Sequence, residues 1–375
     1  MPQFFVSCPK GMVEPLEQEL KDLGLKPYDR SQNGVFFDSN WRDCYRVNLR
    51  SRFASRVLMP VLNFVAYQPE ELYNQILNHD FTKYIKPDQT LTIDASTKDS
   101  MLKDQRFIAM KVKDAIVDQF RDKFGVRPNI DNDRPDLAVY VKTYKNRFSV
   151  AIDTSGDSLF MRGYRLESGD APMKENLAAG LLQLAEWDGK TPIVDPMCGS
   201  GTILIEAAMK LMNIAPGSNR KSFGFMKLQN YDRDMWSEVL DEALDEELPD
   251  CGDIHFYGYD IDKRVLMKAI ENAKRAGVNE FIKFKREEIM SLTAPIEKGV
   301  IITNPPYGAR LGDEDNLKDV YRDFSHTLKN QFKGWNAWIL SGNKELIGDL
   351  KLKSSRKHFV YNGSIECRFL KYEMR

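Results

Sequence analysis

Cysteine and histidine are scarce in this chain. Its 375 residues include 5 cysteines and 4 histidines, and they form no Cys-x-x-Cys pair and no zinc-ligand spacing. This excludes a disulfide scaffold and argues against a structural metal site, so we expect a reducing, cytoplasmic setting and no bound metal. The scattered cysteines are Cys8, Cys44, Cys198, Cys251 and Cys367.

Long hydrophobic runs are absent as well. The most apolar stretch, residues 57–67, is interrupted by Pro60 and Asn63, and it is much shorter than the roughly 20 residues that a membrane span needs. The apolar run near the first residue is too short for a secretory signal. We therefore expect a soluble protein with no membrane partner.

The chain also lacks a net charge of one sign. Its formal net charge is −1, so any affinity for nucleic acid has to come from a local patch. A helix predicted over residues 41–57 would align Arg42, Arg46 and Arg50 in a basic stripe, with a merely solvated helix face as the alternative. The acidic segment 232–253 is predicted to be a solvated helical insertion away from any RNA. The other basic candidates for an RNA contact are Lys111, Arg162 and Arg165.

The pattern of predicted elements divides the chain into three regions. Residues 1–60 and 61–165 each mix short strands and helices, which is typical of small α+β modules. From residue 166 to 375, strands alternate with helices, which predicts a doubly wound, mostly parallel α/β sheet that binds ligands at the carboxyl ends of its strands. The strands predicted there are 193–194, 254–259, 281–285, 299–303, 335–340 and 365–372.

A glycine-containing loop follows the first of these strands. The sequence Gly199-Ser200-Gly201 lets the backbone approach a ligand closely, but Leu204 replaces the third glycine of a dinucleotide fingerprint. No Gly-Lys-Ser/Thr follows, which argues against a nucleotide-triphosphate loop. The candidate ligand-binding residues of this loop are Asp195, Pro196, Met197, Cys198, Gly199, Gly201 and Thr202.

Acidic residues end the strands that line this loop. Asp195 suits a ligand with a positively charged amine, and S-adenosylmethionine (SAM) carries such an amine together with a sulfonium. Asp260 is placed to accept hydrogen bonds from a ribose diol, with Asp262 as a second candidate, and Glu288 could receive the adenine amino group. For each single carboxylate, the alternative is a helix N-cap.

The tetrapeptide Asn304-Pro305-Pro306-Tyr307 follows the predicted strand 299–303. The two prolines stiffen the turn and contribute no backbone donor. The Asn304 side-chain oxygen and the Pro305 carbonyl could therefore accept both hydrogens of a planar exocyclic amine beside the cofactor. Tyr307 could stack on an extruded base. No cysteine nucleophile accompanies this turn, so the predicted target is an amino nitrogen rather than a pyrimidine carbon.

These motifs resemble the THUMP-domain class I SAM-dependent RNA methyltransferases, in particular the RlmL type, the bacterial 23S rRNA guanine-N2 methyltransferases. The resemblance rests on residues 195–202 and 304–308 and on the shorter matches at 110–118, 162–165, 171–175 and 329–335.

The resemblance implies a ferredoxin-like module at 1–60, a THUMP RNA-binding domain at 61–165 and a Rossmann-like class I methyltransferase domain with a seven-stranded sheet at 166–375. It also implies a role in rRNA processing, with N2-methylguanosine in domain V of 23S rRNA as the product. Glu288 departs from the family's more frequent aspartate. No second methyltransferase follows in this sequence, so a single modification is expected.

Several alternatives stay open on the sequence alone. The same tetrapeptide serves N6-adenine DNA methyltransferases, and THUMP domains also occur in tRNA guanine-N2 methyltransferases. A non-catalytic RNA-binding or assembly protein is the third alternative, although the intact loop and tetrapeptide argue against it. The RNA partner is expected to be 23S rRNA or a ribosome assembly intermediate, and the chain a monomer or weak dimer.

Overall fold

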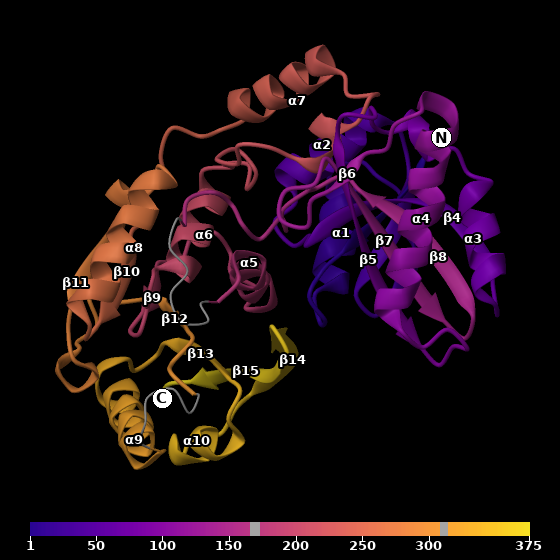
Figure 1. Cartoon of the computed structure of the whole chain (residues 1–375). Helices are drawn as coiled ribbons and strands as arrows, with labels where there is room; N and C mark the ends of the chain where they lie inside the picture. Colours follow the sequence, from indigo (N-terminus) through magenta and orange to yellow (C-terminus); the bar gives the residue numbers. More distant parts are fainter. Residues whose placement is uncertain (166–172, 308–313) are drawn as a thin grey trace.

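The computed structural model of the chain describes residues 1–165, 173–307 and 314–375. In these ranges, an N-terminal part up to residue 165 and a C-terminal part from residue 173 are each built on a separate β-sheet (Figure 1). Ala171, Pro172 and Gly308, which belong to two of the sequence motifs, lie outside the described residues. No helix in the described ranges is both long enough and apolar enough to cross a bilayer.

One eight-stranded sheet runs through the whole N-terminal part. Its central strand β4 pairs antiparallel with β1 on one side and with β8 on the other. The predicted module boundary at residue 60 therefore falls inside β4, and the two α+β modules share a sheet. The strands are β1 (Gln3–Ser7), β2 (Tyr28–Ser31), β3 (Gly34–Asp38), β4 (Arg56–Val65), β5 (Thr90–Lys98), β6 (Asn129–Ile130), β7 (Leu137–Tyr144) and β8 (Arg147–Asp153), in the order β2-β3-β1-β4-β8-β7-β5-β6.

The helix expected over residues 41–57 is shorter than predicted. Helix α2 spans Trp41–Arg50 and begins where the Asn40 side chain accepts the backbone N–H of Asp43, an N-cap. The apolar spacing continues to Val57, but that residue already belongs to β4 and is buried there. The other N-terminal helices are α1 (Val13–Asp22), α3 (Pro69–Leu77) and α4 (Gln105–Phe124).

The C-terminal part confirms the predicted doubly wound, mostly parallel sheet. Its seven strands follow the order β11-β10-β9-β12-β13-β15-β14, and only β15 runs against the others, antiparallel to both β13 and the edge strand β14. The strand order reverses between β9 and β12, which is where open α/β sheets bind their ligands. The strands are β9 (Ile193–Asp195), β10 (Phe256–Asp260), β11 (Ile282–Arg286), β12 (Val300–Thr303), β13 (Asn336–Ser341), β14 (Arg356–Asn362) and β15 (Ile365–Glu373).

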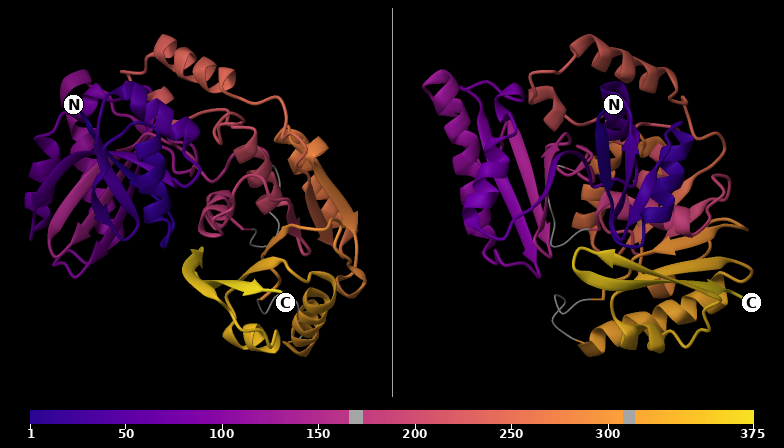
Figure 2. Two further views of the ribbon diagram at one scale, coloured as in Figure 1. Left: turned by 180° about the vertical axis from the view of Figure 1, so that it is seen from behind. Right: turned by 90° about the vertical axis from the view of Figure 1, so that its right-hand side faces the viewer.

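The helices of this part alternate with its strands, except for one excursion. The alternating helices are α5 (Glu175–Leu184), α6 (Thr202–Leu211), α8 (Lys263–Arg275), α9 (Glu314–Gln331) and α10 (Lys344–Asp349). The excursion is α7 (Arg233–Asp245), which lies at the periphery and crosses over α2 of the N-terminal part (Figures 1 and 2). It is helical as predicted, but Val239 and Ala243 are buried, so one face is packed rather than solvated.

Candidate active site

Asp195 ends β9 at the switch point of the sheet. Its carboxylate is 1% exposed and accepts the Thr303 hydroxyl from the neighbouring strand β12 at 2.6 Å and the Met197 backbone N–H at 3.3 Å. Burial raises the pKa of this carboxyl to about 7. A cationic group bound beside it would favour the ionised form, because an opposite charge offsets the lost solvation.

The loop after β9 is fastened to the end of β10. The Cys198 N–H donates to the Tyr259 carbonyl at 2.8 Å, and the Gly199 N–H donates to Asp260 Oδ2 at 3.0 Å. Gly199 and Gly201 both have a positive φ, and a Cβ on Gly201 would lie 3.0 Å from the Phe284 ring. The Cβ direction of Gly199 meets no described atom within 4 Å, so this side of the loop is open to a ligand.

Asp260 is half-buried at the end of β10. Besides the bond from Gly199, its Oδ1 accepts the Asp262 N–H at 2.9 Å, and burial raises its pKa. A carboxylate offers about four lone-pair sites, so part of its acceptor capacity remains for a ribose hydroxyl. The predicted ribose contact stays a prediction.

The two more distant carboxylates have different surroundings. Asp262 is the N-cap of α8, where it accepts the Arg264 N–H at 2.8 Å, and its carboxylate also lies 3.4 Å from the Arg264 guanidinium. Asp262 is therefore a helix N-cap, which is the alternative given above for each single carboxylate. Glu288 is exposed at the start of a short 3₁₀ turn and makes no capping bond, and its predicted adenine contact stays a prediction.

Cys198 is a buried loop residue. It is 7% exposed, and burial raises the pKa of its thiol well above the ordinary value. The neutral thiol is a poor nucleophile, which agrees with the prediction that this cysteine serves the loop and not a covalent step.

The Asn304-Pro305-Pro306-Tyr307 turn follows β12 directly. Asn304 Oδ1 is buried and has no hydrogen-bond partner among the described residues. The Tyr307 hydroxyl accepts Asn362 Nδ2 at 2.9 Å, and its ring faces Gly342, where a Cβ would lie 2.9 Å away. The turn is thus tied to β13 and β14, while the Asn304 oxygen is left free. Stacking of Tyr307 on a base stays a prediction.

The predicted basic stripe on α2 is paired within the chain. Arg42 forms ion pairs with Glu238 and Glu242 of α7, and Arg50 pairs with Glu246 just beyond that helix. The third arginine of the stripe, Arg46, lies 2.8 Å from Asp43. The arginines of this helix therefore do not form a free basic surface, because Arg42 and Arg50 meet glutamates of the segment that was expected to be only solvated. Their contact with RNA stays a prediction.

Two further RNA candidates also have other surroundings. Arg162 is 2% exposed and donates to the Leu159 carbonyl at 2.7 Å. Its side chain is therefore not accessible for the direct RNA contact that the sequence suggested. Arg165 is largely buried, donates to the Thr202 hydroxyl of the glycine loop, and lies 3.5 Å from Glu175. Lys111 is half-buried on α4, and its RNA contact stays a prediction.

Sequence reasoning missed residues that hold the site together. Thr303 fixes Asp195, and Asn272 of α8 donates to the Ser200 carbonyl at 3.2 Å. A threonine at a strand end, such as Thr303, gives no distinctive sequence pattern. An asparagine inside a helix, such as Asn272, is unusual enough to have been noticed as a weak signal. The Arg165–Glu175 contact joins two sides of the 166–172 segment, and no local spacing predicts it.

Together these features define a class of protein. A seven-stranded sheet in this order, an acidic strand end, a glycine loop and an Asn-Pro-Pro-Tyr turn at the switch point are the parts of a class I SAM-dependent methyltransferase. The open side of Gly199, the buried Asp195 carboxyl and the unpaired Asn304 oxygen fit SAM and an amine substrate. The described residues hold no group of three or more His, Cys, Asp or Glu side chains suited to a metal ion.

Family models match most of the chain in three pieces. The RlmL ferredoxin-like domain matches residues 3–58, the THUMP domain matches 66–153, and the RMKL-like methyltransferase domain matches 162–371. The chain belongs to the RMKL-like methyltransferase family, whose cofactor is SAM.

Individual relatives agree with this assignment. The ribosomal RNA large subunit methyltransferase K/L of Methylococcus capsulatus is 40% identical over 99% of this chain and 51% of its own length. The slr0064 protein of Synechocystis sp., provisionally named an RNA methyltransferase, is 37% identical over 99% of this chain and 96% of its own. The crystal structure of SMU.472 complexed with SAH, also provisionally named a methyltransferase, has a TM-score of 0.88 and 31% identity and covers 100% of this chain and 98% of that one. The chain spans about half the length of the K/L relatives that it matches.

Proposed function

We propose that this chain transfers a methyl group from SAM to the exocyclic N2 amine of a guanine in 23S rRNA, in domain V. The observation that carries the proposal is the buried Asn304 oxygen, which has no partner within residues 1–165, 173–307 and 314–375, next to the Asp195–Thr303 pair at the switch point. A buried acceptor left unpaired costs about 1–3 kcal/mol, and such a cost is repaid when a substrate amine donates to it.

The Asn304 side-chain oxygen and the Pro305 carbonyl act on the amine by accepting hydrogen bonds from its two N–H groups. The lone pair of an exocyclic amine is delocalised into the base, and accepting both hydrogens shifts electron density back onto the nitrogen. The turn holds both acceptors rigidly, since Pro305 is buried and Tyr307 is anchored to Asn362. Catalysis then comes mainly from positioning and electrostatics.

Asp195 and Asp260 act on the cofactor side of the site. SAM supplies an electrophilic methyl group when it is bound. The Asp195 carboxylate attracts the α-amine, and Asp260 accepts the ribose hydroxyls while also holding the Gly199 N–H. Arg165 supports the loop through Thr202, as a positioning residue rather than an RNA contact.

The rRNA target rests on the N-terminal part and on the relatives. A THUMP domain matches residues 66–153, and the K/L relatives are named for the ribosomal large subunit. Proteins that read a DNA sequence need an element that enters a groove, and we recognise none in the sequence of residues 1–165. We propose accordingly that residues 1–60 and 61–165 present folded RNA to the domain at 166–375.

The test is a methyl-transfer assay with the full chain. Methyl-labelled SAM is incubated with 23S rRNA, with tRNA and with duplex DNA, and the nucleosides are identified by mass spectrometry. We expect N2-methylguanosine in 23S rRNA alone. N2-methylguanosine in tRNA alone would move the target, and N6-methyladenine in DNA would overturn the proposal. Nucleosides from rRNA and tRNA of a deletion strain then identify the modified position.

A further inference from the structure

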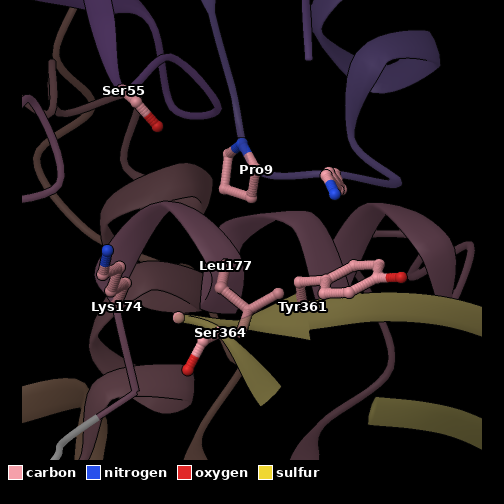
Figure 3. A pocket seen from close by; sticks show the side chains of 8 residues that line it. Pro9, Ser55, Lys174, Leu177, Tyr361 and Ser364 are labelled. Atoms are coloured by element: carbon pink, nitrogen blue, oxygen red, sulfur yellow. The ribbon is translucent and has the colours of Figure 1, made fainter. Parts of the chain in front are cut away.

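A cavity of about 390 Å³ lies between the N-terminal part, the start of α5 and the β14–β15 turn (Figure 3). Pro9 and Ser55 border it from the N-terminal part, and Lys174 and Leu177 border it from α5. Tyr361 and Ser364 border it from the hairpin, as Figure 3 shows, and Lys10 and Gly363 complete the lining. The cavity is distinct from the glycine loop and from the Asn304 turn.

The two lysines of this cavity differ from the arginines of α2. Within the described part of the chain, neither Lys10 nor Lys174 forms an ion pair with a carboxylate. Each instead lies over an aromatic ring, Lys10 5.1 Å from the Tyr361 centroid and Lys174 4.7 Å from that of Phe160. A cation–π contact orients an ammonium group without cancelling its charge, so both lysines remain available to an anion.

Neutral donors supplement these charges. Lys174 is the N-cap residue of α5 and makes no side-chain capping bond. Ser55 accepts Asn176 Nδ2 at 3.1 Å, which leaves its own hydroxyl hydrogen to donate into the cavity. Ser364 is exposed on the hairpin turn. Two cations together with hydroxyl groups suit a phosphate group.

The cavity shares its hairpin with the catalytic turn. Asn362 follows the cavity residue Tyr361 and donates to the Tyr307 hydroxyl. The opposite wall is fixed as well, because a Cβ on Gly11 would lie 2.6 Å from the Phe359 carbonyl, so residues 9–11 pack directly on β14. The cavity and the Asn304 turn are therefore joined through the same hairpin.

We propose that this cavity binds a backbone phosphate of the RNA substrate and guides the strand toward the Asn304 turn. The inference rests on the proposed RNA methyltransferase function and names a contact surface of the same site. It places the RNA path along the junction of the two parts, where Lys10 and Lys174 are unpaired. It does not use the outer face of α2, where the arginines are paired with glutamates.

The test compares two double variants of the full chain. Lys10→Gln/Lys174→Gln removes two charges in the cavity, and Lys26→Gln/Lys298→Gln removes two charges from exposed lysines outside it. RNA affinity is measured by filter binding between 50 and 200 mM KCl, and SAM affinity by calorimetry. We expect the cavity variant to bind 23S rRNA about tenfold more weakly, with a salt slope lower by roughly one, since each phosphate contact contributes about 0.7–0.9. SAM affinity should stay unchanged.

Several outcomes would overturn the inference. Equal RNA affinities of the cavity and control variants would place the RNA elsewhere. Inorganic phosphate could protect the wild type from thermal unfolding while all variants bind RNA equally well. That result would show that the cavity is a site for a small anion and not for RNA. The binding assay needs no turnover, so a wild type that binds RNA but methylates none refutes the proposed function and leaves the cavity to be judged by the binding comparison.

Discussion

At the scale of single residues, the site contains two polar groups that the surrounding described residues leave in an unfavourable state. Asn304 Oδ1 is buried and meets no hydrogen-bond partner in the described part of the chain, and Asp195 is a buried carboxyl with a raised pKa. Core residues that served only stability would satisfy these groups. Each group is favourable only with a ligand of opposite character: a donor amine for Asn304 and a cation for Asp195.

Replacing Asn304 by Ala separates catalysis from cofactor binding. We expect kcat to fall at least 100-fold, because the loss of one well-placed polar group at the reacting centre costs about that much. SAM affinity should stay within a few-fold, and thermal stability should not fall, since the oxygen has no partner to lose. Steady-state kinetics, calorimetry and thermal unfolding measure these quantities, with Asn330→Ala on the exposed face of α9 as the control. A large loss of SAM affinity would instead mean that Asn304 mainly builds the cofactor pocket.

Replacing Asp195 by Asn tests the pKa shift. The folded-state pKa of about 7 lies above the ordinary value of 3.8, so the stabilising contribution of this group is fully present below about pH 4 and is lost as the pH rises through 7. The variant should therefore gain stability relative to the wild type between pH 5 and pH 8. The gain is a few kcal/mol at most, because one pKa unit corresponds to about 1.4 kcal/mol. Thermal unfolding across this range measures it, with the exposed Asp133→Asn as the control.

The same substitution predicts the pH dependence of SAM binding. A cationic amine favours the ionised carboxylate, so wild-type SAM affinity should weaken up to tenfold per pH unit below about pH 7 and level off above it. The Asp195→Asn protein should bind SAM weakly with no such dependence on this group. A wild-type SAM affinity that is constant from pH 5.5 to 8.5 would show that the amine does not rely on Asp195.

At the scale of elements, α2 and α7 form a charged pair of helices across the two parts of the molecule. Tyr45 of α2 stacks on Phe225 with centroids 4.2 Å apart and meets Trp236 of α7 edge-on. Arg42 and Arg50 then reach glutamates on or just beyond α7. The aromatic cluster provides the apolar contact, and the ion pairs fix how the acidic helix lies on it.

Replacing Arg42, Arg46 and Arg50 by Ala should loosen α7 and leave RNA binding intact. Exposed ion pairs contribute about 0.2–1 kcal/mol each, so amide hydrogen exchange in residues 233–245 should accelerate several-fold. The salt slope of RNA binding should match the wild type, because these charges are already paired. A flatter slope together with weaker RNA binding would restore the stripe as an RNA surface.

Local patterns predicted the elements well, and long-range contacts account for what they missed. The strands predicted at 254–259, 299–303 and 335–340 match β10, β12 and β13 within a few residues, because a run of apolar residues is a local signal. The helix predicted to Val57 was too long, since the apolar spacing of α2 continues into a strand. That β4 joins both modules in one sheet depends on partners about 90 residues away, which no window of sequence contains.

The site followed the same division. The strand-end acids and the tetrapeptide were recognisable because their spacing is local and their residue types are unusual together. The burial of Arg162 and the pairing of Arg42 could not be recognised in the sequence. Arg162 meets Glu206 of α6, and Arg42 meets Glu238 of α7, and both helices are distant in the chain. A basic residue in sequence carries no information about which carboxylate it will meet.

At the scale of the whole molecule, a group of buried polar side chains joins the N-terminal part to helix α6. Arg162 donates to backbone carbonyls at the end of α2, including that of Ser51 at 3.3 Å. Its Nε lies 3.6 Å from Glu206 of α6, which also accepts the Tyr164 hydroxyl at 3.1 Å. Arg52 reaches the Ile214 carbonyl beyond α6 at 2.8 Å. Because α6 begins at the glycine loop, the N-terminal part and the glycine loop are fastened to the same helix.

Replacing Arg162 by Ala should therefore destabilise both parts together. The variant leaves Glu206 buried without its cation, and breaking a buried pair costs about 3–5 kcal/mol. We expect one unfolding transition at a markedly lower temperature, with Arg127→Ala at an exposed position as a control that changes stability by less than about 0.5 kcal/mol. The double variant Arg162→Met/Glu206→Leu should recover much of the loss, because apolar replacement of a buried pair removes the unpaired charge. Two separate transitions, with only the N-terminal one shifted, would show that the parts fold independently and that Arg162 does not couple them.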